Sequence, residues 1–235
     1  MHSDPARPST DPQHSVTDPR DSKRYYFHPT PTRVVVVSAL KAIFYLFGDI
    51  QSSGRENLPL DGPVIVAANH ITNFDALPLQ FALPRPLFYI GKEELFRNPV
   101  MDWLFRQLGG FPVYRGARDE WALRHAVKVL EHGSVLGIFP EGTRSKGKGL
   151  KPAKTGAARL AQTVQCPIVP VALYGTQDMF RYFPRRNRVM VTIGTPIYPK
   201  PGDTHLELTD RLMFALAGML PPEDRGAYQV RPPGF

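Results

Sequence analysis

Residues 64–75 read Val-Ile-Val-Ala-Ala-Asn-His-Ile-Thr-Asn-Phe-Asp. The first five side chains are apolar and three of them are β-branched, which is typical of a strand buried on both faces. The strand should end where the polar residues Asn69 and His70 begin. Because ligands of open α/β sheets bind beyond the carboxyl ends of the strands, we expect His70 to lie beside a bound substrate.

The spacing between His70 and Asp75 restricts how the two side chains can meet. Residues five apart on one helix point about 140° away from each other. We therefore expect His70 in a turn, Thr72 or Asn73 as the N-cap of the next helix, and Asp75 in its first turn. A carboxylate that accepts from one ring nitrogen makes the other more basic. The alternative is a core histidine and an aspartate that only starts a helix.

Short apolar runs alternate with helical stretches from Gly54 onward. The expected strands are Val64–Ala68, Leu87–Ile90, Leu136–Phe139, Ile168–Leu173 and Val189–Ile193. The expected helices are Phe74–Leu83, Pro99–Leu108, Asp119–His132, Pro152–Thr163 and His205–Leu220. This rhythm predicts an α/β fold with a largely parallel central sheet flanked by helices.

Composition divides the chain into four parts. Residues 1–24 are rich in Pro, Asp, Ser and Thr and are predicted to be a disordered tail. Residues 25–53 form an N-terminal segment, 54–220 the α/β domain, and 221–235 a C-terminal tail. The apolar run Val34–Phe47 is shorter than the roughly 20 residues of a bilayer span. It suits an amphipathic, membrane-associating helix or a buried core helix.

Charge and cysteine content limit the partners. The net charge is +8 and the sequence pI is about 9.7, which suggests anionic partners such as nucleic acid, phosphorylated metabolites or an anionic bilayer, or else a solvated face. Cys166 is the only cysteine, so an intrachain disulfide is excluded and a reducing compartment is favoured. We expect no signal peptide. The seven histidines lack metal-ligand spacing, and we expect no metal.

Polar residues also follow other predicted strands. Residues 109–115 read Gly-Gly-Phe-Pro-Val-Tyr-Arg, and residues 139–145 read Phe-Pro-Glu-Gly-Thr-Arg-Ser. Lys92 follows the strand Leu87–Ile90, and residues 167–171 read Pro-Ile-Val-Pro-Val. The carboxyl ends of parallel strands meet at one rim, where the fork of an arginine suits a phosphate.

These blocks, in this order, resemble the glycerophospholipid acyltransferase family, in particular the bacterial-type lysophosphatidic acid acyltransferases. The family shows N-H-x4-D, G-x-x-P-V-x-R, F-P-E-G-T-R-S and a V-P-V strand, which stand here at Asn69–Asp75, Gly109–Arg115, Phe139–Ser145 and Ile168–Val171. The resemblance covers roughly Gly54 to Ile193. Ile71 departs from the polar amide that is common there, which leaves the lysophospholipid open.

The resemblance implies a 1-acylglycerol-3-phosphate O-acyltransferase of phospholipid biosynthesis. Such an enzyme moves an acyl group from acyl-CoA or acyl carrier protein to lysophosphatidic acid, giving phosphatidic acid, and needs no cofactor. It implies His70 as the general base and Asp75 as its orienting partner. The implied substrate-binding residues are Asn69, Thr72, Lys92, Arg115, Glu141, Gly142, Thr143 and Arg144. An anionic membrane surface, at the cytoplasmic face of the cell membrane, is the expected partner, with no role for nucleic acid.

Several alternatives stay open at this point. The acceptor could be another lysolipid, or the chain could be a catalytically silent lipid-binding module. Cys166 could be a nucleophile, although a buried cysteine is usually structural. Residues 142–148 approach the spacing of a phosphate-binding P-loop, but Gly149 stands where that loop needs a hydroxyl. No Gly-x-Ser-x-Gly elbow of a serine esterase is present.

Overall fold

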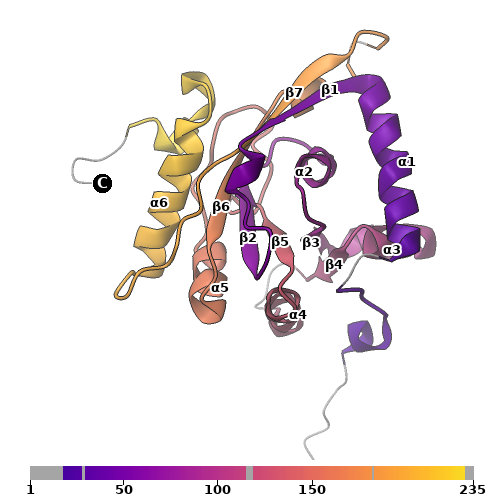
Figure 1. The fold of residues 1–235 in the computed structure, drawn as a ribbon, viewed down its shortest axis with the longest axis horizontal. Coiled ribbons are helices and arrows are strands. Elements are labelled where there is room, and N and C mark those ends of the chain that lie inside the picture. The colour runs from indigo at the N-terminus through magenta and orange to yellow at the C-terminus, as the bar shows by residue number, and fades with distance from the viewer. Residues whose placement is uncertain (1–17, 28–29, 115–118, 182, 231–235) are drawn as a thin grey trace, which may run out of the picture.

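The computed structural model describes residues 18–27, 30–114, 119–181 and 183–230. Within these residues the strands form one seven-stranded sheet of order β1-β7-β6-β2-β5-β3-β4 (Figure 1). The strands are β1 Gly48–Ser53, β2 Val64–Ala68, β3 Leu87–Lys92, β4 Gly110–Val113, β5 Val135–Ile138, β6 Ile168–Tyr174 and β7 Asn187–Ile193. The strands from β6 to β4 run parallel, whereas β7 is antiparallel to β6. The predicted largely parallel sheet is confirmed.

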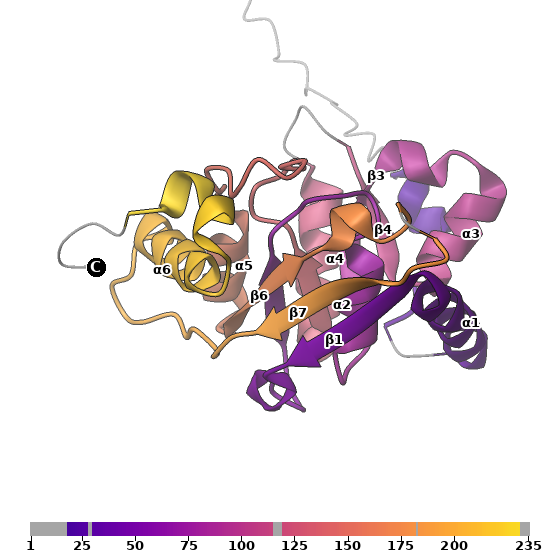
Figure 2. The same cartoon turned by 90° about the horizontal axis from the view of Figure 1, so that it is seen from above.

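Helices cover both faces of this sheet. They are α1 Pro31–Phe47, α2 Ala76–Ala82, α3 Pro99–Gln107, α4 Glu120–Glu131, α5 Gly156–Val164 and α6 His205–Gly218. Side chains of β2 alternate between the two cores: Val64 and Val66 pack with α1 and α2, whereas Ile65 packs with α4, α5 and α6. Figures 1 and 2 both place α1 and α6 on opposite sides of the sheet. The alternation explains why the strand is apolar throughout.

Three details of the elements differ from expectation. The helix α2 begins at Ala76 with Asp75 at its N-cap position, so the prediction that Thr72 or Asn73 caps it is wrong. The helix α5 begins at Gly156 rather than Pro152, because backbone N–H groups before it bond to the loop after β5. The strand β1 was not predicted: it is a half-exposed edge strand, and it pairs with the distant β7.

The expectation of a disordered tail over residues 1–24 is wrong from Asp18 onward. Arg20 is only 7% exposed and pairs with Asp18 and with Asp119 at 2.7 and 2.6 Å. Its guanidinium lies 4.2 Å from the ring of Tyr114 and 4.4 Å from the ring of Trp121. A buried guanidinium needs groups that compensate its charge, and the two carboxylates supply them here. Residues 1–17 lie outside the described chain.

The expected C-terminal tail is also part of the domain up to Val230. The backbone carbonyl of Asp224 accepts from the N–H of Leu150 at 2.9 Å, and Leu150 accepts in turn from Ala227. A Cβ at Gly149 would lie 2.9 Å from the backbone nitrogen of Gly226. Only glycine therefore allows the C-terminal residues to close over the loop that follows β5. Residues 231–235 lie outside the described chain.

The N-terminal segment, residues 25–53, divides into parts with different surroundings. Tyr25 and Phe27 pack against His125 of α4. The helix α1 buries Arg33 and Phe44, and its other face is exposed. No helix of the described chain is both long and apolar enough to cross a membrane. Membrane association of α1 stays a prediction.

His125 lies in an aromatic enclosure beneath the N-terminal segment. Its ring centroid is 4.7 Å from that of Tyr25, 4.6 Å from that of Phe111 and 4.8 Å from that of Trp121. Burial, together with the nearby cations Lys128 and Arg20, lowers the pKa of His125 from 6.5 to about 4. The folded protein therefore keeps this imidazole neutral in weak acid.

We predict that acid weakens the fold through His125. Between pH 6.5 and 4 the unfolded state binds a proton at this imidazole that the folded state does not, so stability falls as pH falls, by on the order of 3 kcal/mol. Urea unfolding from pH 7 to 4.5 should show a shallower pH slope for His125→Phe than for wild type. His205→Phe, at an exposed position, should keep the wild-type slope. Equal slopes for all three proteins would exclude His125 as the source.

Candidate active site

The carboxylate of Asp75 is the centre of the site. Its side chain is fully buried, and Oδ2 accepts from His70 Nδ1 at 2.8 Å. The other donors are the Ile71 N–H at 2.6 Å, the Thr72 N–H at 2.8 Å, the Thr72 hydroxyl at 2.8 Å and the Thr176 hydroxyl at 2.7 Å. Because every neighbour of this carboxyl group donates a hydrogen bond, the group is the ionised carboxylate. A buried carboxylate is stable only where such hydrogen bonds replace those of water.

This carboxylate fixes the tautomer of His70. Because Asp75 can only accept, Nδ1 carries the proton and Nε2 carries the lone pair. The imidazole stacks on Phe139, with ring centroids 4.1 Å apart and 17° between planes. Its side chain is 19% exposed, and no residue of the described chain bonds to Nε2. The ring is thus held rigidly with one basic nitrogen free to take a proton.

Glu141 joins the turn that carries His70, residues 69–75 between β2 and α2, to the loop after β5. Its Oε1 accepts from the N–H of His70 at 2.8 Å, and its Oε2 accepts from the N–H of Lys151 at 2.9 Å. Burial raises the pKa of Glu141, and these two donors oppose part of that rise. The carbonyl of His70 accepts in turn from the N–H of Ser145 at 2.6 Å. Gly142 makes the bend between them at φ +65°, which favours glycine.

Asn69 extends the sheet beyond the end of β2. Its side-chain Nδ2 donates to the carbonyl of Leu173 at 2.9 Å, and its Oδ1 accepts from the N–H of Leu173 at 2.7 Å. The amide therefore replaces the next backbone pair of the β2–β6 ladder. Asn69 and Thr72 were both expected to bind substrate. In the structure the side chain of Asn69 bonds to Leu173 and that of Thr72 bonds to Asp75, and these hydrogen bonds hold the turn that carries His70.

The basic residues of the site lie on one side of His70. In the sheet order, β5 and then β3 follow β2. Arg144 lies in the loop after β5, and Lys92 is the last residue of β3. Both are half-buried and neither has an ion-pair partner in the described chain. Thr143 is exposed beside Arg144, whereas Arg115 lies outside the described residues.

Thr176 is the site residue that sequence reasoning missed. It is 3% exposed, and its hydroxyl donates to Asp75 from a position 101 residues away in the chain. A signal was available, because Gly175 and Thr176 follow the predicted strand Ile168–Leu173, whose carboxyl end lies at the same rim. The sequence alone gave no reason to pair that hydroxyl with Asp75.

Two other chemistries find no support in the geometry. Cys166 is 1% exposed, and burial raises the pKa of its thiol to about 11, so the reactive thiolate is disfavoured. The prediction of a buried cysteine is confirmed. Within the residues that the structure describes, no group of three or more His, Cys, Asp or Glu side chains could hold a metal ion.

Comparisons with known proteins point to one family. A family model described as Acyltransferase matches residues 49–174. A 1-acyl-sn-glycerol-3-phosphate acyltransferase of Bacillus subtilis is 32% identical over 176 residues, which cover 74% of this chain and 86% of the relative. An Escherichia coli protein of the same name is 33% identical over 121 residues, covering 50% of this chain and 49% of the relative.

A solved structure shares the architecture. The crystal structure of the 1-acyl-sn-glycerophosphate (LPA) acyltransferase from Thermotoga maritima superposes with a TM-score of 0.66 at 31% sequence identity. The match covers 79% of this chain and 77% of that chain. The two proteins therefore share the fold.

We predict that Asn69→Leu, which is close in size, destabilises the fold by about 2–4 kcal/mol, because it leaves a buried N–H and a buried carbonyl of Leu173 without partners. Urea unfolding at pH 7 measures this loss. Asn57→Leu is the matched control, since the Asn57 side chain makes a single hydrogen bond, to the carbonyl of Ile193. This substitution should lower the free energy of unfolding clearly less. An equal loss in both variants would contradict the bracing role of Asn69.

Proposed function

The chain belongs to the acyltransferase family that includes the bacterial 1-acyl-sn-glycerol-3-phosphate acyltransferases, and we propose that it acylates the sn-2 hydroxyl of 1-acylglycerol-3-phosphate. The acyl group comes from a thioester, either acyl-CoA or acyl carrier protein, and the product is phosphatidic acid. The observation that carries the proposal is the free Nε2 of His70, held by Asp75 and set beside half-buried cations.

The chemistry follows from the protonation of the pair. The acceptor hydroxyl gives its proton to His70 Nε2 while its oxygen attacks the thioester carbonyl. Asp75 stabilises the imidazolium that forms. The tetrahedral intermediate then expels the thiolate, which takes the proton back from Nε2. Such general-base action contributes about 10²–10⁴-fold, and holding the two substrates together supplies much of the remaining acceleration.

The acceptor phosphate binds on the basic side of His70 in this proposal. Arg144 and Lys92 have no carboxylate partner in the described chain, so their charge is free for an anion. Arg115 joins them on the strength of the family resemblance, and Gly142 and Thr143 contribute the loop between them. Asn69, Thr72 and Glu141 act through the turn that carries His70.

A membrane surface is the second partner that we propose. The outer face of α1 exposes Val34, Val35, Ile43 and Leu46, with exposed fractions of 50–68%. The rings of Phe74 and Phe180 are also exposed and lie near the end of α1, since both contact its buried residue Phe44. The helix carries Lys41 and no acidic residue. Apolar insertion with attraction to anionic lipid suits peripheral binding at the cytoplasmic face.

We predict that His70→Ala lowers kcat at least about 10³-fold, because it removes the base and its orientation. The measurement is phosphatidic acid formed from lysophosphatidic acid in mixed micelles, with oleoyl-CoA and with oleoyl carrier protein. His205→Ala, at an exposed histidine, should keep wild-type activity. Substantial activity of His70→Ala would remove it as the base. A wild type that acylates only another lysolipid, or none, would overturn the proposed function.

We predict that Ile43→Glu weakens binding to anionic vesicles about tenfold or more, because it removes buried hydrocarbon and adds a charge that anionic lipid repels. Co-sedimentation with phosphatidylglycerol vesicles measures this. Val230→Glu is the control, since Val230 is 81% exposed and lies outside α1. If both variants bind vesicles equally, α1 is not the membrane contact.

A further inference from the structure

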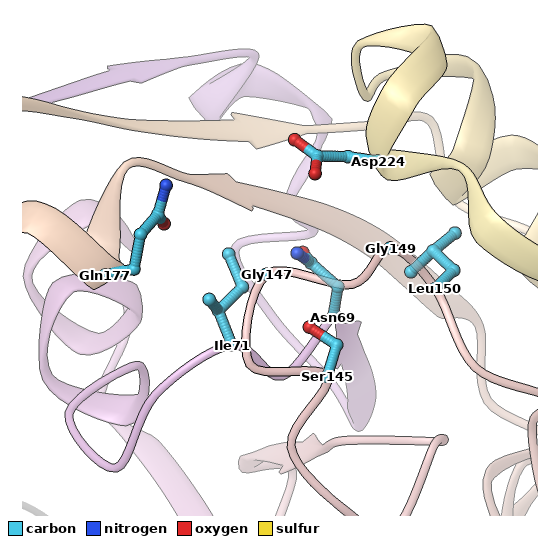
Figure 3. Close-up of a pocket in the computed structure, with 8 residues that line it drawn as sticks. All are labelled: Asn69, Ile71, Ser145, Gly147, Gly149, Leu150, Gln177 and Asp224. Carbon is cyan, nitrogen blue, oxygen red and sulfur yellow. The ribbon is translucent and has the colours of Figure 1, made fainter.

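A pocket lies beside the turn that carries His70, between the loops after β5 and β6 and the C-terminal segment around Asp224 (Figure 3). It encloses about 370 Å³ of empty space, part of it open to solvent. It is lined by Asn69, Ile71, Ser145, Gly147, Gly149, Leu150, Gln177 and Asp224. Asn69 and Ile71 flank His70 in sequence, so the pocket adjoins the base without containing it.

The sheet order explains this position. The strand β6 neighbours β2 on one side, and β5 and β3 follow on the other. Gln177 comes shortly after β6, whereas Lys92 ends β3. Ser145, Gly147, Gly149 and Leu150 belong to the loop after β5, so the pocket spans the ends of β5, β2 and β6, whereas Lys92 lies farther along the rim.

The lining of the pocket disfavours a phosphate. None of the described residues that line it is a lysine or arginine, and Figure 3 shows the Asp224 carboxylate directed towards Gln177 across the opening. A carboxylate without a cation repels an anion. Gln177 offers an amide, Ser145 a hydroxyl, and Ile71 with Leu150 an apolar wall. This combination suits a neutral chain that carries amide groups.

Asp224 is built into this position. Its backbone carbonyl accepts from Leu150, and its own N–H bonds to Pro221. Its carboxylate is half-buried and has no hydrogen-bond or ion-pair partner among the described residues. Burial and the neighbouring Glu223 raise the pKa of Asp224. The Asp224 carboxylate is therefore a fixed, partly desolvated acceptor, and an N–H or O–H group of a ligand would satisfy it.

We propose that this pocket binds the pantetheine arm of the acyl thioester, the part that acyl-CoA and acyl carrier protein share. The assignment rests on the proposed function. The arm is a neutral chain with two amides and a hydroxyl, so Asp224 accepts from its donors, Gln177 pairs with an amide, and Ile71 and Leu150 contact its methylenes.

The same loop offers groups for the phosphate that follows the arm. Lys146 and Lys148 alternate with the lining glycines Gly147 and Gly149, and both lysines are exposed. They are absent from the pocket lining, so they suit a phosphate outside the opening. Both donors carry this phosphate, so the loop binds acyl-CoA and acyl carrier protein through the same group.

The kinetic test uses Gln177→Leu and Asp224→Leu, with Gln51→Leu and Glu223→Leu as matched controls outside the lining. Each pocket variant should raise KM for oleoyl-CoA and for oleoyl carrier protein about fivefold or more, as expected for one lost hydrogen bond. KM for lysophosphatidic acid should stay at its wild-type value, and so should KM for an oleoyl S-ethyl thioester that lacks the arm. Arg144→Ala should give the opposite pattern and raise KM for the acceptor only.

Direct binding separates this inference from the proposed function. The probe is the unreactive oleyl thioether of coenzyme A, titrated calorimetrically against each protein. The pocket variants should bind it about fivefold more weakly, and this holds even if the wild type fails to acylate lysophosphatidic acid. Unchanged binding, or a rise in KM for the acceptor, would overturn the assignment. A loss confined to coenzyme A donors would place the contact beyond the shared arm and would also overturn it.

Discussion

The buried carboxylate of Asp75 is the interaction on which the site depends. A charge without solvent is stable only when donors surround it, and here the donors come from two separate stretches of chain, the turn after β2 and the loop after β6. Satisfying this one group therefore sets the shape of the turn, the start of α2 and the tautomer of His70. The orientation of His70, the base in our proposal, is a product of that compensation.

The sheet order brings the loops after β6, β2 and β5 together. Because β2 lies between β6 and β5, the loops after these strands meet at the turn that carries His70. The loop after β5 carries Arg144 as well as four residues of the pocket lining, and Lys92 lies farther along the rim, at the end of β3. A reaction between an anionic acceptor and a donor with a neutral arm suits a pocket whose described lining lacks lysine and arginine and that lies near separate cations.

Local sequence patterns predicted most elements of the central domain but failed at the two ends of the chain. Apolar runs and their polar breaks predicted the strands β2, β3, β5, β6 and β7, the helix α6, and the meeting of His70 and Asp75. Composition failed at both ends of the chain. The described parts of the two predicted tails, residues 18–24 and 221–230, are mostly polar, yet both contact the domain. Arg20 pairs with Asp119, and Leu150 bonds to Asp224 and Ala227.

The sequence by itself determined the fold class and the meeting of His70 with Asp75, since strand periodicity and the five-residue spacing are local and leave few geometries open. Only the tertiary structure decided that Thr176 completes the Asp75 site, that Glu141 clamps two loops and that Asn69 continues the β2–β6 ladder. These contacts join residues 101, 71 and 104 positions apart. No local pattern encodes such pairs, because each depends on which strands become neighbours when the whole chain folds.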